Sequence, residues 1–281
     1  MICRAYGKIN LSLNITGVRE DGYHTLESIF LPIDFYDLIN IEKSENMEYL
    51  CNKYYIRFNE SNTVVKAVEL MKKEFNITDN FKIDLKKQIP TQAGLAGGSS
   101  DGACIIKAFN KMYNLNLSEE KIIELCTSIG SDVLFTYYTK PAYVSSVGEK
   151  IEFIDVKKDY YVLLVKPRFG VSTKECYNLM NLDTCSHPDI NKLKEALEKG
   201  EDYLPYLGNS MEDAAISLVE DIKKAKEDLL EAGAPFALMS GSGSTVFTMS
   251  DDENFIRNLH SKLENKKYYI RYAKVIKNQG N

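Results

Sequence analysis

The residues best suited to chemistry form a glycine-rich stretch at residues 90–101, with the sequence PTQAGLAGGSSD. Gly94, Gly97 and Gly98 permit backbone angles that other residues avoid and let a ligand approach the main chain closely. The small polar residues that follow are typical of helix starts. Because free N–H groups and the helix dipole favour negative charge at such an end, the stretch predicts a phosphate site. A tight turn into a capped helix is the alternative.

The glycine spacing excludes two common nucleotide-binding loops. No lysine follows the glycines, as a Walker loop requires, and the spacing differs from the dinucleotide pattern G-x-G-x-x-G. A predicted strand at 81–85 and a predicted helix at 102–115 nevertheless give the strand–loop–helix context of a phosphate loop. A second glycine-serine stretch, MSGSGSTVF at 239–247, is typical of a hairpin turn or of a second loop of this kind.

Two further places carry polar groups in suggestive positions. Residues 8–15 alternate between polar and apolar side chains, which predicts a half-buried strand with Lys8 and Asn10 on its polar face. That face is either exposed to water or forms one wall of a polar site in which Lys8 binds an anion. Asp132, among small and apolar residues, either caps a short helix from Val133 or supplies a carboxylate for catalysis, and the two roles are compatible.

The elements that position these residues alternate in type along the chain. Periodicity predicts helices at 62–75, 189–199 and 209–232, and strands at 36–43, 54–58, 81–85, 142–146, 149–153, 160–166, 236–239 and 268–276. This mixture indicates an α+β fold. A charged stretch after residue 155 suggests two domains, 1–155 and 156–281.

Composition excludes several classes of protein. The 281 residues are 44% hydrophobic and 27% charged, as in globular proteins, and the net charge of −5 provides no basic field to attract nucleic acid. The six cysteines are scattered, which favours reduced thiols in a cytoplasmic protein over a zinc site or a disulfide framework. No apolar run reaches the ~18 residues that a membrane span needs, so we expect no membrane partner.

Three segments, 8–13, 90–101 and 240–247, resemble the three motifs of the GHMP kinases in order and in spacing. The stretch REDGYHTL at 19–26 resembles the signature of one family among them, the 4-diphosphocytidyl-2-C-methyl-D-erythritol kinases. The resemblance implies a two-domain GHMP kinase fold, with an N-terminal domain like ribosomal protein S5 and a ferredoxin-like C-terminal domain.

The same resemblance implies an activity. ATP would be the co-substrate, with Mg²⁺, and the acceptor would be the 2-hydroxyl of a small molecule, methylerythritol linked to cytidine diphosphate. This step belongs to non-mevalonate isoprenoid precursor biosynthesis. Other GHMP kinases, acting on homoserine, mevalonate or a sugar, and a non-catalytic binding protein of the same fold remain the alternatives.

Roles for individual residues follow from the matched motifs. Asp132 matches the catalytic aspartate and Lys8 the lysine beside it. The residues matched to the cytidyl substrate are Asn10, Tyr23, His24 and Tyr177. Those matched to ATP are Pro90, Gly94, Leu95, Ala96, Gly97, Gly98, Ser99, Ser100, Gly241, Ser242 and Gly243. The metal ligands stay open.

The chain departs from the usual family pattern at a few positions. Leu134 stands where proline commonly follows Asp-Val, and Lys140-Pro141 stands where glycine is usual. Ser146 replaces the first glycine of G-x-G-E, and residues 209–212 (NSME) vary a motif with Asp at its second position. Lys8, Asp132 and the glycines of the first loop are all retained.

Overall fold

The computed structural model describes residues 1–277, and the chain forms two compact units. Unit 1 comprises Met1–Gly7, Phe35–Pro90 and Ala96–Thr139. Unit 2 comprises Lys8–Asp34, Thr91–Leu95 and Lys140–Asn281. The division into 1–155 and 156–281 stays a prediction, and its last four residues lie outside the described part.

Two long strands, β1 (Ile2–Val18) and β2 (His24–Ser44), pair with each other and contribute to both units. The apolar face predicted at residues 8–15 is confirmed, since Ile9 and Ile15 are fully buried. The opposite face is buried as well. Lys8 and Asn10 are 3% exposed and Ser12 is inaccessible, so an exposed polar face is wrong for these three side chains.

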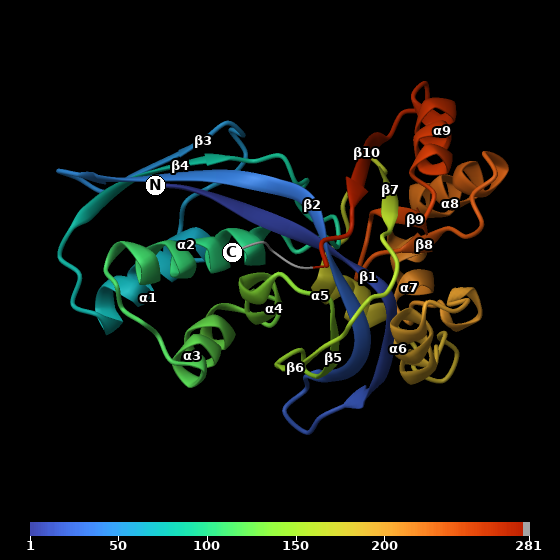
Figure 1. Ribbon diagram of the computed structural model, residues 1–281, viewed down its shortest axis with the longest axis horizontal. Helices are drawn as coiled ribbons and strands as arrows, with labels where there is room; N and C mark the ends of the chain where they lie inside the picture. The colour runs from blue at the N-terminus through green and yellow to red at the C-terminus, as the bar shows by residue number, and fades with distance from the viewer. Residues whose placement is uncertain (278–281) are drawn as a thin grey trace. The chain divides into compact units, whose positions relative to one another are not determined.

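In unit 1, the end of β2 lies antiparallel to β4 (Asn80–Lys86), which also pairs in parallel with β3 (Glu48–Cys51). Figure 1 shows the helices of this unit on one side of these strands: α1 (Thr63–Glu74), α2 (Gly97–Met112), α3 (Glu119–Ile129) and α4 (Val133–Tyr138). Their apolar sides fill the core, where the rings of Phe81 and Phe109 lie 4.8 Å apart. The core thus holds α2 against β4.

Local sequence patterns predict one helix of this unit correctly and one strand wrongly. Asn62 accepts a hydrogen bond from the amide of Val64 and caps α1, which confirms the helix predicted at 62–75. The strand predicted at 54–58 is wrong, because this stretch forms a turn in which Tyr54 is 98% exposed and pairs with no strand. The neighbouring strand β3 ends at Cys51.

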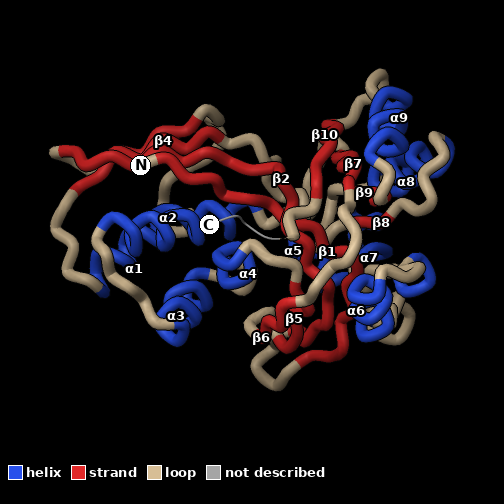
Figure 2. Tube along the Cα trace, in the orientation of Figure 1, coloured by secondary structure: helices blue, strands red, loops and turns tan. Residues whose placement is uncertain are grey.

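In unit 2, β2 pairs with β5 (Ala142–Ser146), which forms a hairpin with β6 (Lys150–Phe153). A second, antiparallel sheet has the order β10-β7-β9-β8. Its strands are β7 (Tyr161–Lys166), β8 (Leu238–Met239), β9 (Val246–Ser250) and β10 (Tyr269–Lys274). Strands and helices alternate in both units, which confirms the α+β class (Figure 2).

The helices of unit 2 are α5 (Thr173–Leu179), α6 (Ile190–Lys199), α7 (Glu212–Leu218), α8 (Asp221–Glu231) and α9 (Glu253–Leu263), with a 3₁₀ turn at Leu204–Tyr206. The single helix predicted at 209–232 is wrong, because Val219 has non-helical angles (φ −140°, ψ 89°) that end α7 before α8 begins. Buried side chains of α8 and α9 pack with those of β7 and β9. No helix within residues 1–277 is both long and apolar enough to cross a membrane.

A buried ion cluster joins the end of β4 to the first turns of α2 in unit 1. Lys87 is 4% exposed, its ammonium lies 2.7 Å from Asp101, and it also binds Asp37. Asp37 accepts the amides of Gln88 and Ile89 with its other oxygen. Complete burial and the nearby Asp37 raise the pKa of Asp101 to about 8, against the opposing effect of Lys87. The cluster therefore links β2, the residues before the glycine stretch and α2.

Removing the cation should leave the buried Asp37 carboxylate uncompensated and Asp101 without its partner. We expect Lys87→Met to lower the free energy of unfolding by about 3–5 kcal/mol. Lys86→Met is the matched control, because Lys86 is 56% exposed and pairs with Asp84 at the surface, and it should change stability by less than about 1 kcal/mol. Urea unfolding of both variants measures the difference. Equal stability of the two would contradict a structural role for the buried cluster.

Candidate active site

In unit 1, the glycine stretch becomes the first turn of α2. Ala96 occupies the N-cap position in the left-handed conformation (φ 54°), and its side chain makes no capping hydrogen bond. The amides of Gly97, Gly98 and Ser99 therefore have no intrahelical acceptors. The hydroxyl of Ser100 is buried and finds no hydrogen-bond partner within residues 1–277. A helix end with free amides of this kind suits an anion.

The helix begins at Gly97, five residues before the predicted start at 102. Close packing beneath this first turn requires glycine at residue 97. A Cβ atom at Gly97 would lie 2.8 Å from a methyl of Ile89 and 3.0 Å from the ammonium of Lys87. The hydroxyl of Thr63 donates to the carbonyl of Gly98 at 2.5 Å and ties α1 to the same turn. Gly97 and Gly98 both lie within α2, and Pro90 lies before it in the same unit.

In unit 2, residues 91–95 of the first glycine segment (90–101) lie against the second glycine segment (239–247). A Cβ atom at Gly94 would lie 1.9 Å from the carbonyl oxygen of Ser240, and Gly94 has φ 71°. The hydroxyl of Ser240 donates to the carbonyl of Gly94 at 2.9 Å, and the amide of Thr245 donates to Ala93. The carbonyl of Leu95 accepts the amide of Lys8 at 3.1 Å. The structure thus brings together two segments far apart in sequence.

The polar face of β1 belongs to the same assembly. The ammonium of Lys8 binds the side-chain oxygen of Asn10 and lies 4.3 Å from the ring centroid of Phe30. Asn10 donates through its side chain to Ser28 at 3.0 Å, and its amide donates to the hydroxyl of Ser240 at 3.1 Å. Lys8 is therefore oriented by groups that are themselves held in place.

The second glycine segment is supported from behind by α7 and the turn before it. The side-chain amide of Asn209 donates to the carbonyls of Met239 and Gly241, at 2.8 Å each. Glu212 accepts the amide of Met239 and binds Lys226. Residues 209–212 therefore keep a supporting role in spite of their variant sequence.

The tip of that segment has left-handed glycines and a side-chain contact with α5. Gly241 and Gly243 have φ 56° and 87°, and the hydroxyls of Ser242 and Thr173 lie 2.7 Å apart. A Cβ atom at Gly241 would lie 3.0 Å from the side-chain oxygen of Asn10. The tip therefore lies against β1.

Asp132 stands in unit 1 immediately before α4 and is half-buried. Its side chain makes no capping hydrogen bond to the helix, although it occupies the N-cap position. Its carbonyl instead accepts the amide and the hydroxyl of Thr136, both at 3.1 Å. The carboxylate is thus not used to cap α4.

Two of the predicted cytidine-binding residues, His24 and Tyr177, lie against each other. His24 and Tyr177 stack with ring centroids 4.4 Å apart and an interplanar angle of 26°. Two rings at this distance already contact each other, so a base would stack on an outer face. Burial lowers the pKa of His24, which favours a neutral imidazole at pH 7. Tyr23 is 65% exposed, in a turn where Asp21 accepts its amide.

One departure from the family pattern has a visible consequence. Ser146, which stands where glycine is usual, has φ 64° at the end of β5. The turn therefore keeps the left-handed conformation that suits glycine, now with a side chain that pays a steric penalty for it.

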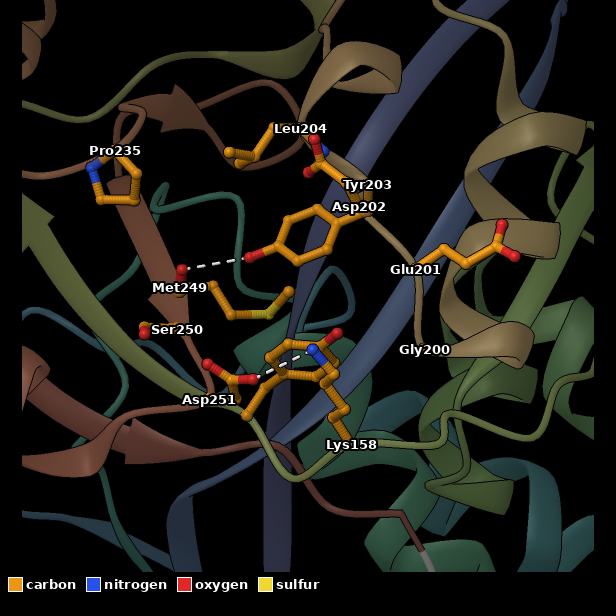
Figure 3. A pocket seen from close by; sticks show the side chains of 11 residues that line it. Lys158, Gly200, Glu201, Asp202, Tyr203, Leu204, Pro235, Met249, Ser250 and Asp251 are labelled. Carbon is orange, nitrogen blue, oxygen red and sulfur yellow. Dashed lines mark hydrogen bonds and ion pairs between the residues drawn. The ribbon is translucent and has the colours of Figure 1, made fainter.

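A separate cavity of about 330 Å³ lies in unit 2 and is shown in Figure 3. Tyr203 donates to the carbonyl of Met249 across it at 3.1 Å, and Lys158 pairs with Asp251. None of the residues predicted for the site lines it.

Several residues that hold the site together carried no signal strong enough to single them out. Ser28, Ser240 and Asn209 act through hydrogen bonds to distant segments, which periodicity within one segment does not reveal. Ser240 and Asn209 each begin a stretch that resembles a family motif, 240–247 and 209–212, whereas Ser28 lies in none. Within residues 1–277, no group of three or more His, Cys, Asp or Glu side chains is placed to hold a metal ion.

Comparison with known proteins agrees with this geometry. The GHMP kinases N terminal domain matches residues 62–140, and the GHMP kinases C terminal domain matches residues 181–270. The 4-diphosphocytidyl-2-C-methyl-D-erythritol kinase of Clostridium beijerinckii is 41% identical over 256 residues, which cover 90% of this chain and 91% of that protein. The kinase of the same name from Clostridium tetani is 36% identical over 282 residues, covering 98% and 100%.

Solved structures show the same relationship. A crystal structure of 4-(cytidine 5'-diphospho)-2C-methyl-D-erythritol kinase has a TM-score of 0.83 and 27% identity, and the match covers 98% of this chain and 99% of that one. Homoserine kinase from Cytophaga hutchinsonii has a TM-score of 0.72 at 15% identity over 96% of this chain and 94% of that one, a likeness of fold. The two-domain α+β fold is therefore confirmed, and the chain belongs to the GHMP kinases, within the family of 4-diphosphocytidyl-2-C-methyl-D-erythritol kinases.

Proposed function

We propose that the chain transfers the γ-phosphoryl group of ATP to the 2-hydroxyl of 4-diphosphocytidyl-2-C-methyl-D-erythritol, in isoprenoid precursor biosynthesis. The observation that carries the proposal is identity of 36–41% with kinases of that name over nearly the whole chain. The glycine segments and the buried Lys8–Asn10 pair support it, because phosphoryl transfer depends on positioning and charge stabilisation.

The start of α2 is assigned to the phosphates of ATP. The free amides of Gly97, Gly98 and Ser99 would donate to phosphate oxygens, and the helix dipole would add to their effect. Local donors of this kind are needed because the chain carries a net charge of −5. The segment Ser240–Thr245, which is bonded to Gly94, would hold the neighbouring part of the loop in place.

Asp132 is assigned the role of general base. The new bond forms between the acceptor oxygen and the γ-phosphorus, while the bond from that phosphorus to the bridging oxygen breaks and ADP leaves. Asp132 would accept the proton of the hydroxyl, a role for which its carboxylate is not diverted by capping. Lys8 would stabilise negative charge on the transferring phosphoryl group.

Mg²⁺ is expected with ATP and would neutralise phosphate charge when bound. Such an ion takes most of its ligands from phosphate and water and only one or two from protein. The partnerless hydroxyl of Ser100 fits that requirement, since it is a buried oxygen at the start of α2.

The cytidyl group is assigned to the face of unit 2 that carries the His24–Tyr177 stack. A pyrimidine could extend this stack on an outer ring face, and the neutral imidazole of His24 could both donate and accept. Tyr23, exposed in the adjacent turn, and Asn10 complete the residues we assign to the substrate. We place the enzyme in the cytoplasm, where its six unpaired cysteines would stay reduced.

The role of Asp132 is tested by replacement with asparagine, which keeps its shape but cannot accept the proton. We expect kcat of Asp132→Asn to fall by about 10²–10⁴-fold, the usual contribution of a general base. Affinity for the cytidyl substrate, measured by titration calorimetry, should stay within a few-fold. Asp155→Asn is the control, because Asp155 is an exposed carboxylate paired with Lys157, and it should leave turnover unchanged. Turnover of Asp132→Asn close to that of the wild type would refute the assignment.

The aromatic stack makes a separate prediction about the substrate. We expect Tyr177→Ala to raise KM for the cytidyl substrate by about 5- to 150-fold, because base stacking contributes about 1–3 kcal/mol. KM for ATP should stay unchanged, and Tyr177→Phe, which keeps the ring, should behave like the wild type. Steady-state kinetics with each substrate varied in turn measures the split. An equal rise in both KM values would show that the ring only supports the fold.

A further inference from the structure

A buried lysine at the end of β7 has no place in the chemistry described so far. Lys166 is 6% exposed, and its ammonium donates to the carbonyls of Pro167 and Phe169, at 2.9 and 3.3 Å. Burial lowers the pKa of Lys166, and within residues 1–277 no carboxylate offsets that effect. An uncompensated buried cation costs stability, whereas an apolar residue of similar length would not. The position therefore calls for a role other than core packing.

The carbonyl of Phe169 connects this lysine to the second glycine segment. The hydroxyl of Ser244 donates to the same oxygen at 2.6 Å, so that Lys166 and Ser244 share one acceptor. The amide of Ser244 in turn donates to the carbonyl of Gln92, at 3.3 Å. Phe169 is therefore connected to Gln92 of the first glycine segment through two hydrogen bonds, both made by Ser244.

The residues after Phe169 reach the first glycine segment directly. The amide of Val171 donates to the carbonyl of Gln92 at 3.4 Å, beside the bond from Ser244. A Cβ atom at Gly170 would lie 2.5 Å from Cβ of Gln92, which leaves no room for a side chain. Gln92 itself has φ 51°, a conformation uncommon for this residue type. The three segments 91–95, 166–171 and 240–245 thus form one tightly packed junction.

We propose that Lys166 is a positioning residue for nucleotide binding, which sets the relative placement of the two glycine segments through the turn at residues 167–169. Its ammonium is the one charged donor in these contacts, and hydrogen bonds from charged groups are stronger than those between neutral groups. Without it, the carbonyl of Pro167 loses its donor and the turn can shift, together with Ser244 and Gln92. The inference rests on the proposed function, because these segments affect ligand affinity only if they hold nucleotide.

The test compares two replacements of Lys166 with a control lysine of the same unit. We expect Lys166→Met to raise the dissociation constant for ADP by about tenfold, measured by titration calorimetry, and to raise KM for ATP equally. KM for the cytidyl substrate should stay within twofold, and kcat within threefold. Lys166→Arg, which keeps the charge and the donors, should recover ADP affinity to within threefold of the wild type. Lys199→Met should change nothing, because Lys199 is 57% exposed and pairs with Glu195 along α6.

A double-mutant cycle separates positioning from general weakening. If Lys166 and Ser244 act through the shared carbonyl, Lys166→Met and Ser244→Ala combined should impair ADP binding no more than the worse single variant. Additive losses would overturn the proposal, as would wild-type ADP affinity in Lys166→Met. If Lys166→Met fails to fold, Gly170→Ala perturbs the same junction. Unchanged ADP affinity in both Gly170→Ala and Ser244→Ala would then overturn the proposal. An enzyme that binds ADP but does not phosphorylate the cytidyl substrate would contradict the proposed function and leave this test valid.

Discussion

The close approach of Gly94 to Ser240 is the constraint on which the site in unit 2 depends. The backbone of residue 94 comes so near the carbonyl of Ser240 that no side chain fits there. The hydroxyl of Ser240 then bonds both the carbonyl of Gly94 and the amide of Asn10, although these partners lie 146 and 230 residues away in sequence. Both hydrogen bonds of Ser240 join neutral groups, whereas the charged donor Lys166 acts at the neighbouring turn, residues 167–169.

The buried polar face of β1 follows from the same junction. Burial of Lys8, Asn10 and Ser12 would be costly if their polar atoms lacked partners. Ser12 exchanges hydrogen bonds with the backbone of Gly208, and Asn10 bonds Lys8, Ser28 and Ser240. A satisfied network of this kind fixes the orientation of its members. Lys8 therefore projects from a rigid strand, which positions a functional group more precisely than a mobile loop would.

The sequence predicted the parts of the site that local chemistry determines. Glycines in the first loop, the cap at Asn62 and the alternation in β1 each act within a few residues, so their consequences were predictable. The contacts between distant segments were not, because periodicity shows which face of a strand is buried but not which segment covers it. Lys166 shows this limit, since it ends an ordinary apolar strand and gains its role only from the carbonyl that it shares with Ser244.

The two errors in element assignment have the same origin. The stretch at 54–58 has the composition of a strand but pairs with no neighbour, so it forms a turn. The stretch at 209–232 has a continuous helical pattern, yet Val219 is non-helical where α7 ends before α8. In both places the local preference of the sequence was not enough to determine the element.

The central claim is that this chain phosphorylates a cytidyl-linked alcohol with ATP. The most direct measurement is ³¹P NMR of the products formed by the wild-type protein with ATP and 4-diphosphocytidyl-2-C-methyl-D-erythritol, compared with homoserine and mevalonate as acceptors. The account predicts one new phosphomonoester, at the tertiary 2-hydroxyl, for each ADP formed, and none with the other two acceptors. Phosphorylation of homoserine or mevalonate in preference to the cytidyl substrate, or release of ADP without a phosphorylated alcohol, would contradict it.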